Sequence, residues 1–96
     1  MDRNGYNPSI LATWDWECYI CSNFAETVRH EVFYGTANRR NSKKYGTWVY
    51  LCPRCHAALH ADPDGLDAEL KRHTQWVFER THTREEFMEI FGRSYK

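Results

Sequence analysis

The order of hydrophobic and polar residues predicts a two-stranded hairpin near the middle of the chain. Residues 27–34 and 47–51 are rich in β-branched and aromatic side chains, which is typical of strands. We expect these strands to pair in an antiparallel manner. Residues 35–46 are polar, basic and bounded by glycine, a composition that predicts a loop. Residues 1–13 show no sustained period and are expected to form an irregular arm.

The pattern after the second strand predicts three helices. Pro53 suits the first position of a helix that continues to His60, because an N–H group has no partner at that position. Residues 62–65 interrupt this helix, and residues 66–81 carry an imperfect apolar stripe with helical spacing. Thr83 begins a capping box for the last helix. The expected buried face and end of that helix are Phe87, Ile90, Phe91 and Gly92.

Length and composition bound the fold. A chain of 96 residues is expected to form one domain with a modest core, and such small domains often need an additional cross-link. We divide it into an arm at residues 1–13, a core at residues 14–60 and a helical extension at residues 61–96. The aromatic content of 16% argues against disorder.

Charge and hydropathy limit the cellular compartments and the kinds of partner that we expect for this chain. The formal net charge is zero, but residues 29–44 are basic and residues 61–91 are mainly acidic. No apolar run approaches the roughly 20 residues that a membrane helix needs, and the N-terminus lacks a signal-peptide pattern. We therefore expect a cytoplasmic protein without a membrane partner.

Four cysteines occur as two C-x2-C pairs, one on each side of the predicted hairpin. The pairs are Cys18 with Cys21 and Cys52 with Cys55. In a reducing compartment this spacing favours a closed tetrahedral zinc site over disulfides. Two disulfides in a secreted protein are the alternative. Trp14 and Trp16, just before the first pair, are expected to pack in the core or against zinc rather than stack on bases.

A second group of candidate metal-binding side chains lies in the first predicted strand and in the helix that begins at the second cysteine pair. His56 and His60 are four residues apart, so on a helix they lie on one face and can share one metal ion. His30 and Glu31 lie in the first predicted strand, where neighbouring side chains point to opposite faces. The basic residues of the predicted loop are candidates for phosphate contact, with Arg39 and Arg40 favoured because their guanidinium groups match phosphate oxygens.

The order of these motifs resembles that of the small HNH nucleases of bacteriophages and prophages. The similarity covers residues 18–60: a cysteine pair, His30-Glu31, a basic segment, a strand, and a second cysteine pair followed by His56 and His60. The resemblance implies an α+β fold, a zinc-stapled ββα-metal, treble-clef-like finger followed by two C-terminal helices. It also implies an origin in a phage or prophage and a location in the bacterial or phage-infected cell.

The resemblance further implies a metal-dependent DNA endonuclease that cleaves or nicks phosphodiester bonds in double-stranded DNA. Zn²⁺ is then structural, and Mg²⁺ or another divalent cation is bound by His30, His56 and His60. Either His30 or Glu31 activates water. The nucleic-acid-binding residues are expected to be Arg39, Arg40, Lys43 and Lys44.

Two positions depart from the family pattern. Where the family has two adjacent histidines, this chain has His30 followed by Glu31. Where the family has an asparagine, this chain has Thr47. The alternative function is therefore a catalytically reduced zinc module, an adaptor or inhibitor that binds DNA or a protein. The acidic side chains of the last two helices favour a protein partner.

Overall fold

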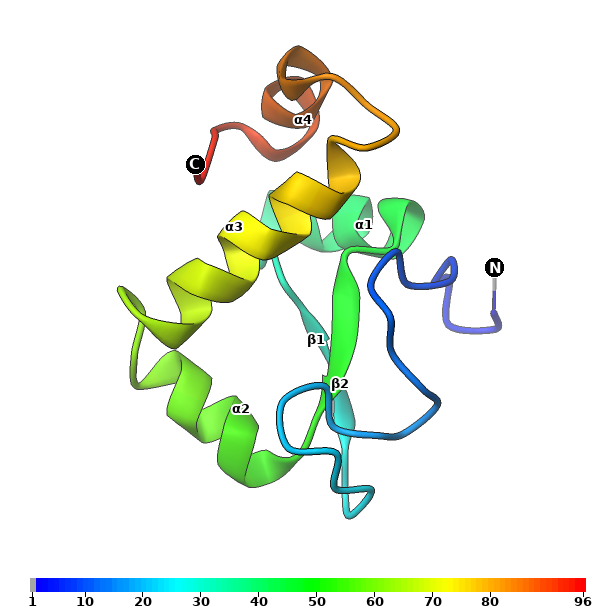
Figure 1. The fold of residues 1–96 in the computed structure, drawn as a ribbon. Helices are drawn as coiled ribbons and strands as arrows, with labels where there is room; N and C mark the ends of the chain where they lie inside the picture. The colour runs from blue at the N-terminus through cyan, green and yellow to red at the C-terminus, as the bar shows by residue number, and fades with distance from the viewer. Residues whose placement is uncertain (1) are drawn as a thin grey trace.

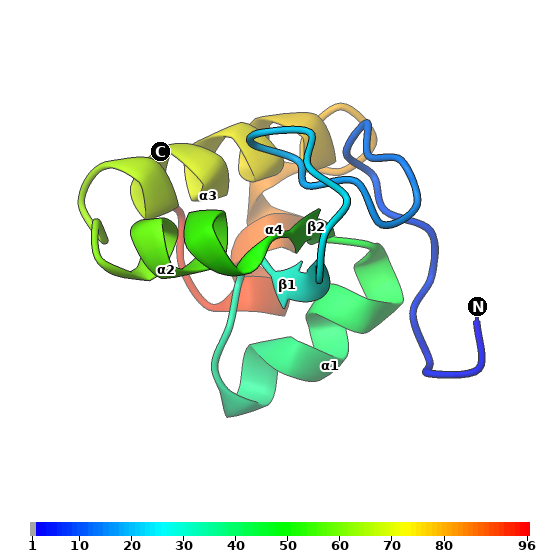
Figure 2. The same ribbon diagram turned by 90° about the horizontal axis from the view of Figure 1, so that it is seen from below.

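Two short antiparallel strands lie at the centre of the molecule, with helices on both sides (Figure 1; Figure 2). The computed structural model describes residues 2–96. Its elements, in chain order, are β1 (Val28–Glu31), α1 (Thr36–Tyr45), β2 (Trp48–Leu51), α2 (Pro53–His60), α3 (Leu66–Phe78) and α4 (Arg84–Phe91). Helices α2 and α3 lie on one side of the hairpin, and α1 lies on the other (Figure 2).

The predicted hairpin is confirmed, with shorter strands. Val28 pairs with Leu51 and Glu31 pairs with Trp48 in an antiparallel register. The first strand ends at Glu31 rather than at residue 34, because the chain turns there toward α1. Both helices predicted after residue 65 are present, although the first ends at Phe78. The Thr83 capping box is formed as predicted.

The loop predicted at residues 35–46 is wrong, because this segment is the ten-residue helix α1. Its sequence has no apolar stripe, and tertiary contacts hold it instead. The Ser42 hydroxyl, fully buried, donates to the Phe33 carbonyl at 2.9 Å, and the Asn41 amide donates to the Ile90 carbonyl at 2.8 Å. The helix ends at Gly46, where φ is 71° and a Cβ atom would clash with the Pro8 carbonyl.

The arm at residues 2–13 contains no helix or strand, as predicted, but it packs along β2. Ser9 donates to the Trp48 carbonyl, and the Trp48 indole donates to the Asn7 carbonyl. Beyond the arm, the core prediction for the two tryptophans is wrong. Trp14 is 75% exposed and Trp16 is 58% exposed, because they lie on the irregular loop before the first cysteine pair.

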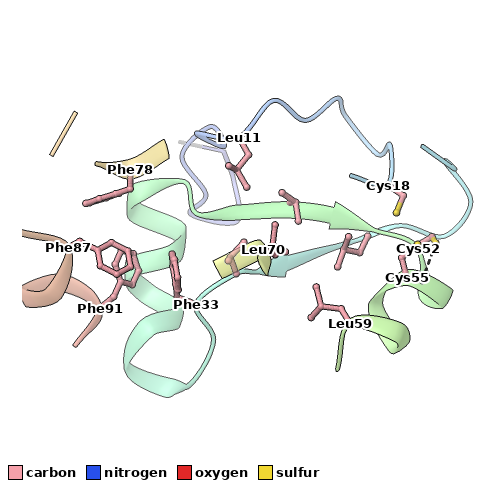
Figure 3. Close-up of a cluster of buried hydrophobic side chains, with 13 residues drawn as sticks. Leu11, Cys18, Phe33, Cys52, Cys55, Leu59, Leu70, Phe78, Phe87 and Phe91 are labelled. Carbon is pink, nitrogen blue, oxygen red and sulfur yellow. Dashed lines mark hydrogen bonds between the residues drawn. The ribbon is translucent and has the colours of Figure 1, made fainter. Parts of the chain in front are cut away.

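The buried side chains change in character along the hairpin (Figure 3). At one end, Phe33 packs against Phe87 and Phe91 with ring centroids 5.1 and 4.7 Å apart. At the other end the buried group contains three of the four cysteines. Aromatic packing therefore holds α4 against the rest of the core. At the other end, cysteine side chains join α2 to the loop that carries Cys18 and Cys21, which we call the first knuckle. Among residues 2–96, no helix has both the length and the apolar character needed to cross a bilayer.

Candidate functional site

The four cysteines meet at one point beside the end of the hairpin. Their sulfur atoms all lie within 4.8 Å of one another, and Cys21 Sγ is 3.7 Å from Cys52 Sγ. All four are free thiols, so the disulfide alternative has no support. A tetrahedral zinc ion with Zn–S bonds of about 2.3 Å places its sulfur ligands roughly 3.8 Å apart. The cluster therefore has the donors and spacing to hold a structural metal such as zinc.

Local backbone geometry presents these thiols inward. Ser22 adopts a left-handed conformation with φ of 66°, and its N–H donates to the Cys18 carbonyl at 2.9 Å, which closes the first knuckle. Cys52 is the N-cap of α2, and its sulfur accepts from the Cys55 N–H at 3.5 Å. Pro53 occupies the start of α2, as predicted.

When no cation is bound, the thiols of Cys18 and Cys55 differ in how readily they ionise. Burial opposes ionisation of Cys18, but backbone N–H groups outweigh it and lower the pKa of this thiol to about 6. Burial, followed by hydrogen bonding to the neighbouring thiols, raises the pKa of Cys55 to about 12. A divalent cation among the four sulfurs removes this conflict, because it stabilises every thiolate at once.

Three histidines form a second cluster. His30 projects from β1 toward α2, where His56 and His60 lie one turn apart on a single face. Their ring nitrogens lie within 4.8 Å of one another, and the Nε2 atoms of His56 and His60 are 3.1 Å apart. Ligands on a tetrahedral zinc with Zn–N bonds of about 2.05 Å are roughly 3.3 Å apart. The structure thus brings together the three residues predicted to share a divalent ion.

The chemistry of these side chains fits a transition-metal ion. His30 is 4% exposed and its Nε2 has no hydrogen-bond partner. Burial, then the charges of His56 and His60, lower the pKa of His30 to about 4, so this imidazole is neutral near pH 7. Burial also lowers the pKa of His56. Neutral imidazoles suit ions such as Zn²⁺, whereas Mg²⁺ prefers oxygen ligands, so the predicted Mg²⁺ has no support in this donor set.

The histidine cluster opens onto a cavity of about 460 Å³. Glu31 lines the same cavity, although adjacent strand residues usually face opposite sides. It is the last residue of β1, and its carboxylate is drawn toward α1 by an ion pair with Arg39 at 3.2 Å. Glu31 therefore lies beside the histidines without belonging to their cluster.

The structure brings only part of the predicted basic set to the cavity. Arg39 lines it, but Arg40, Lys43 and Lys44 do not. Lys43 Nζ instead lies 5.0 Å from the centre of the Tyr6 ring. Sequence reasoning also missed Arg29, which reaches the cavity with its guanidinium 4.3 Å from the Tyr6 ring centre. Only its place next to His30 in the strand hinted at this position.

A polar network around the buried Asp67 carboxylate lies next to the histidine cluster and was not predicted. The Tyr34 ring lies 5.4 Å from His60 and 6.0 Å from His30, between centroids. The Tyr34 hydroxyl donates to Asp67 at 2.6 Å, and Lys71 contacts the same carboxylate oxygen at 3.2 Å. Hydrogen bonding to Asp67 raises the pKa of Tyr34. This network ties the cavity wall to the first turn of α3, a long-range contact that has no local sequence signal.

Thr47 occupies the position where the HNH pattern carries asparagine. Its side chain is fully buried, and its hydroxyl lacks a partner. The main chain is fixed instead, because the Thr47 N–H donates to the Ser42 carbonyl and the Thr47 carbonyl accepts from Val32. Backbone contacts thus hold this end of β2 without an amide side chain.

Comparison with known proteins found no match: no family model, no curated protein and no solved structure is similar to this chain.

Proposed function

We propose that the protein is an HNH-like endonuclease that hydrolyses phosphodiester bonds in DNA with the help of a divalent transition-metal ion. The observation that carries this proposal is the convergence of His30, His56 and His60 at the wall of a cavity. Three histidines leave a coordination position open, which is typical of catalytic rather than structural metal sites. The resemblance of residues 18–60 to HNH nucleases agrees with a phosphodiester substrate.

Each side chain has a distinct role in this mechanism. His30, His56 and His60 hold the ion, which when bound stabilises negative charge on the phosphate oxygens. Of the two candidate bases, Glu31 is preferred because His30 is used as a ligand. Glu31 accepts a proton as water adds to phosphorus; one P–O bond then breaks, and the leaving oxygen takes a proton from solvent.

The test is plasmid relaxation with Zn²⁺, Mn²⁺ or Mg²⁺. We expect nicking by the wild type with a transition-metal ion, and a loss of about 100-fold or more in His56→Ala and Glu31→Gln. His73→Ala is the matched control, because His73 is an exposed residue of α3 outside both clusters. Supercoiled plasmid that stays intact with micromolar wild-type protein and every one of these ions would reject the enzyme.

A zinc module that docks on another protein is the second candidate. The feature that favours it is a group of exposed aromatic side chains close in sequence to the first cysteine pair: Trp14 and Phe24 line one surface hollow, and Trp16 is also exposed. Solvent-exposed aromatic groups of this size often mark protein contacts. In that case Trp14→Ala abolishes partner binding, and His56→Ala has no effect on function. The acidic C-terminal helices, predicted earlier as a docking surface, lie outside this patch.

A further inference from the structure

A surface hollow formed by the segment before β1 has walls of aromatic and acidic side chains. The hollow measures about 550 Å³ and is lined by Trp14 and Phe24, whose side chains are 75% and 61% exposed, and by Thr13, Asp15 and Glu17. We call it the loop hollow. Large apolar rings are costly to expose to water, so two of them on one hollow indicate a contact surface.

Backbone hydrogen bonds fix the two stretches that carry these rings. The Glu17 N–H donates to the Trp14 carbonyl at 3.1 Å, which closes a turn at the first ring. The Cys18 N–H donates to the Asn23 carbonyl at 2.8 Å, which brings the residue before Phe24 next to that turn. The hollow is therefore formed before a ligand enters it, and binding does not have to order the loop.

The charge of the loop hollow is negative. Asp15 and Glu17 line it, and no lysine or arginine among residues 2–96 does so. Neither carboxylate forms an ion pair within the described part of the chain. Residues 14–28 contain a third acidic side chain, Glu26, and no basic one. This charge attracts a cation and repels the phosphates of DNA.

A second hollow, which also includes Asp15, already holds a cation with the same kinds of group. Its cation is the Arg29 guanidinium. The central carbon of that guanidinium lies 4.3 Å from the centre of the Tyr6 ring and 4.7 Å from that of Trp48, and Asp2 forms an ion pair with it. The molecule thus binds one guanidinium between aromatic rings and a carboxylate, and the loop hollow presents the same combination to solvent.

We infer that the loop hollow binds the side chain of an arginine on a partner protein. The guanidinium lies against the rings of Trp14 and Phe24 and donates to the carboxylates of Asp15 and Glu17. Arginine suits this site better than lysine, because its planar group stacks on rings and carries five N–H donors. The inference rests on the docking function given above as the second candidate, and it names the partner's chemistry. It does not depend on hydrolysis at the histidine cluster, whose cavity shares no lining residue with the loop hollow.

The probes are end-blocked peptides of sequence Gly-Leu-Xaa-Leu-Gly, in which Xaa is arginine, lysine, citrulline or glutamate. Citrulline is the matched control, because it has the shape of arginine without the charge. Each peptide is titrated into ¹⁵N-labelled, zinc-loaded full-length protein, and the indole N–H signals are followed. The arginine peptide should shift the Trp14 signal but not that of Trp76, an exposed side chain of α3 outside the hollow. The lysine peptide should bind more weakly, and the citrulline and glutamate peptides at least fivefold more weakly.

An aromatic variant tests the stacking contact. Trp14→Ala should weaken binding of the arginine peptide at least fivefold. Trp76→Ala is the matched control and should leave the affinity unchanged. The Trp14 and Trp76 side chains are 75% and 50% exposed, so both variants should keep the fold, which the melting temperature checks.

A charge variant tests the ion pairs. Asp15→Asn combined with Glu17→Gln should weaken binding of the arginine peptide at least fivefold and reduce its dependence on salt. Glu85→Gln combined with Glu89→Gln removes the same charge from exposed positions of α4 and should not weaken binding. The difference between the two double variants separates local ion pairing from the effect of net charge.

The arginine site would be overturned by equal affinity of the arginine and citrulline peptides, by tighter binding of the lysine peptide, or by a Trp14 signal that does not move. It would also be overturned if a DNA dodecamer, or dilution of the protein alone, shifted that signal, because DNA or a second copy would then occupy the hollow. Plasmid nicking is assayed separately. Peptide binding without nicking rejects the enzyme and keeps the site, whereas nicking without peptide binding rejects the site alone.

Discussion

The two clusters of metal-binding side chains both draw ligands from α2, and they differ in donor number, burial and access. The cysteine cluster gathers four sulfurs around the start of α2, and three of its members are buried. The histidine cluster joins His56 and His60 of α2 to His30 of β1 and opens onto a cavity. Four donors fill a tetrahedral ion, whereas three leave a position for substrate or water. One helix thus separates a site suited to holding the fold from a site suited to chemistry.

Loss of the cysteine cluster should have the largest effect. Cys55→Ser removes one ligand from a site that joins the first knuckle to α2, and in small metal domains zinc binding supplies about 10–16 kcal/mol of folding free energy. We expect unfolding at room temperature, together with loss of zinc. Circular dichroism and metal analysis of the purified protein provide the measurement. A Cys55→Ser protein that stays folded and zinc-free would show that the cluster is not structural.

Removal of the histidine-bound ion should leave the fold intact. A mild chelator should strip this ion first, because three donors with solvent access hold a metal less tightly than four buried ones. We expect the far-UV circular dichroism to stay unchanged while nicking activity is lost. The same chelator applied to His60→Ala should remove no ion, since that variant has lost the site beforehand. Unfolding in step with the first ion removed would contradict the division of roles.

The Tyr34 network should have an intermediate effect. Tyr34→Phe keeps the ring against His60 but leaves the buried Asp67 carboxylate without its 2.6 Å hydrogen bond. Loss of a hydrogen bond to a charged group costs about 1.5–3 kcal/mol, which urea denaturation would detect. The affinity of the histidine cluster for its metal ion should fall less in Tyr34→Phe than in His56→Ala. Tyr95→Phe is the control, because the Tyr95 ring packs on Phe33 and its hydroxyl has no such carboxylate partner among residues 2–96. If Tyr34→Phe and the wild type had the same free energy of unfolding, the Tyr34–Asp67 hydrogen bond would not stabilise the fold.

The smallest effect is expected from a helix cap far from both clusters. Thr83→Ala breaks the capping box of α4 and should lower the free energy of unfolding by about 1 kcal/mol. Metal content and nicking should stay at the wild-type level, because α4 contributes no residue to either cluster. If Thr83→Ala bound less metal than the wild type, metal binding at the clusters would depend on the overall stability of the fold rather than on their own ligands.

Local sequence signals predicted the elements that carry the two clusters. The C-x2-C spacing placed the four cysteines together, and the i, i+4 spacing placed His56 and His60 on one face. The prediction failed where tertiary contacts decide the structure. Helix α1 has no apolar stripe, and its buried Ser42 bonds to Phe33 from outside the helix. For the same reason the Tyr34–Asp67 contact was not visible in the sequence.

The most direct test of the central claim, that one chain holds a closed and an open metal site, is the zinc stoichiometry measured by native mass spectrometry. The wild type should bind two zinc ions per chain at saturation, and His56→Ala should bind one while keeping its fold. A single zinc ion in both proteins would contradict the open site and with it the proposed nuclease.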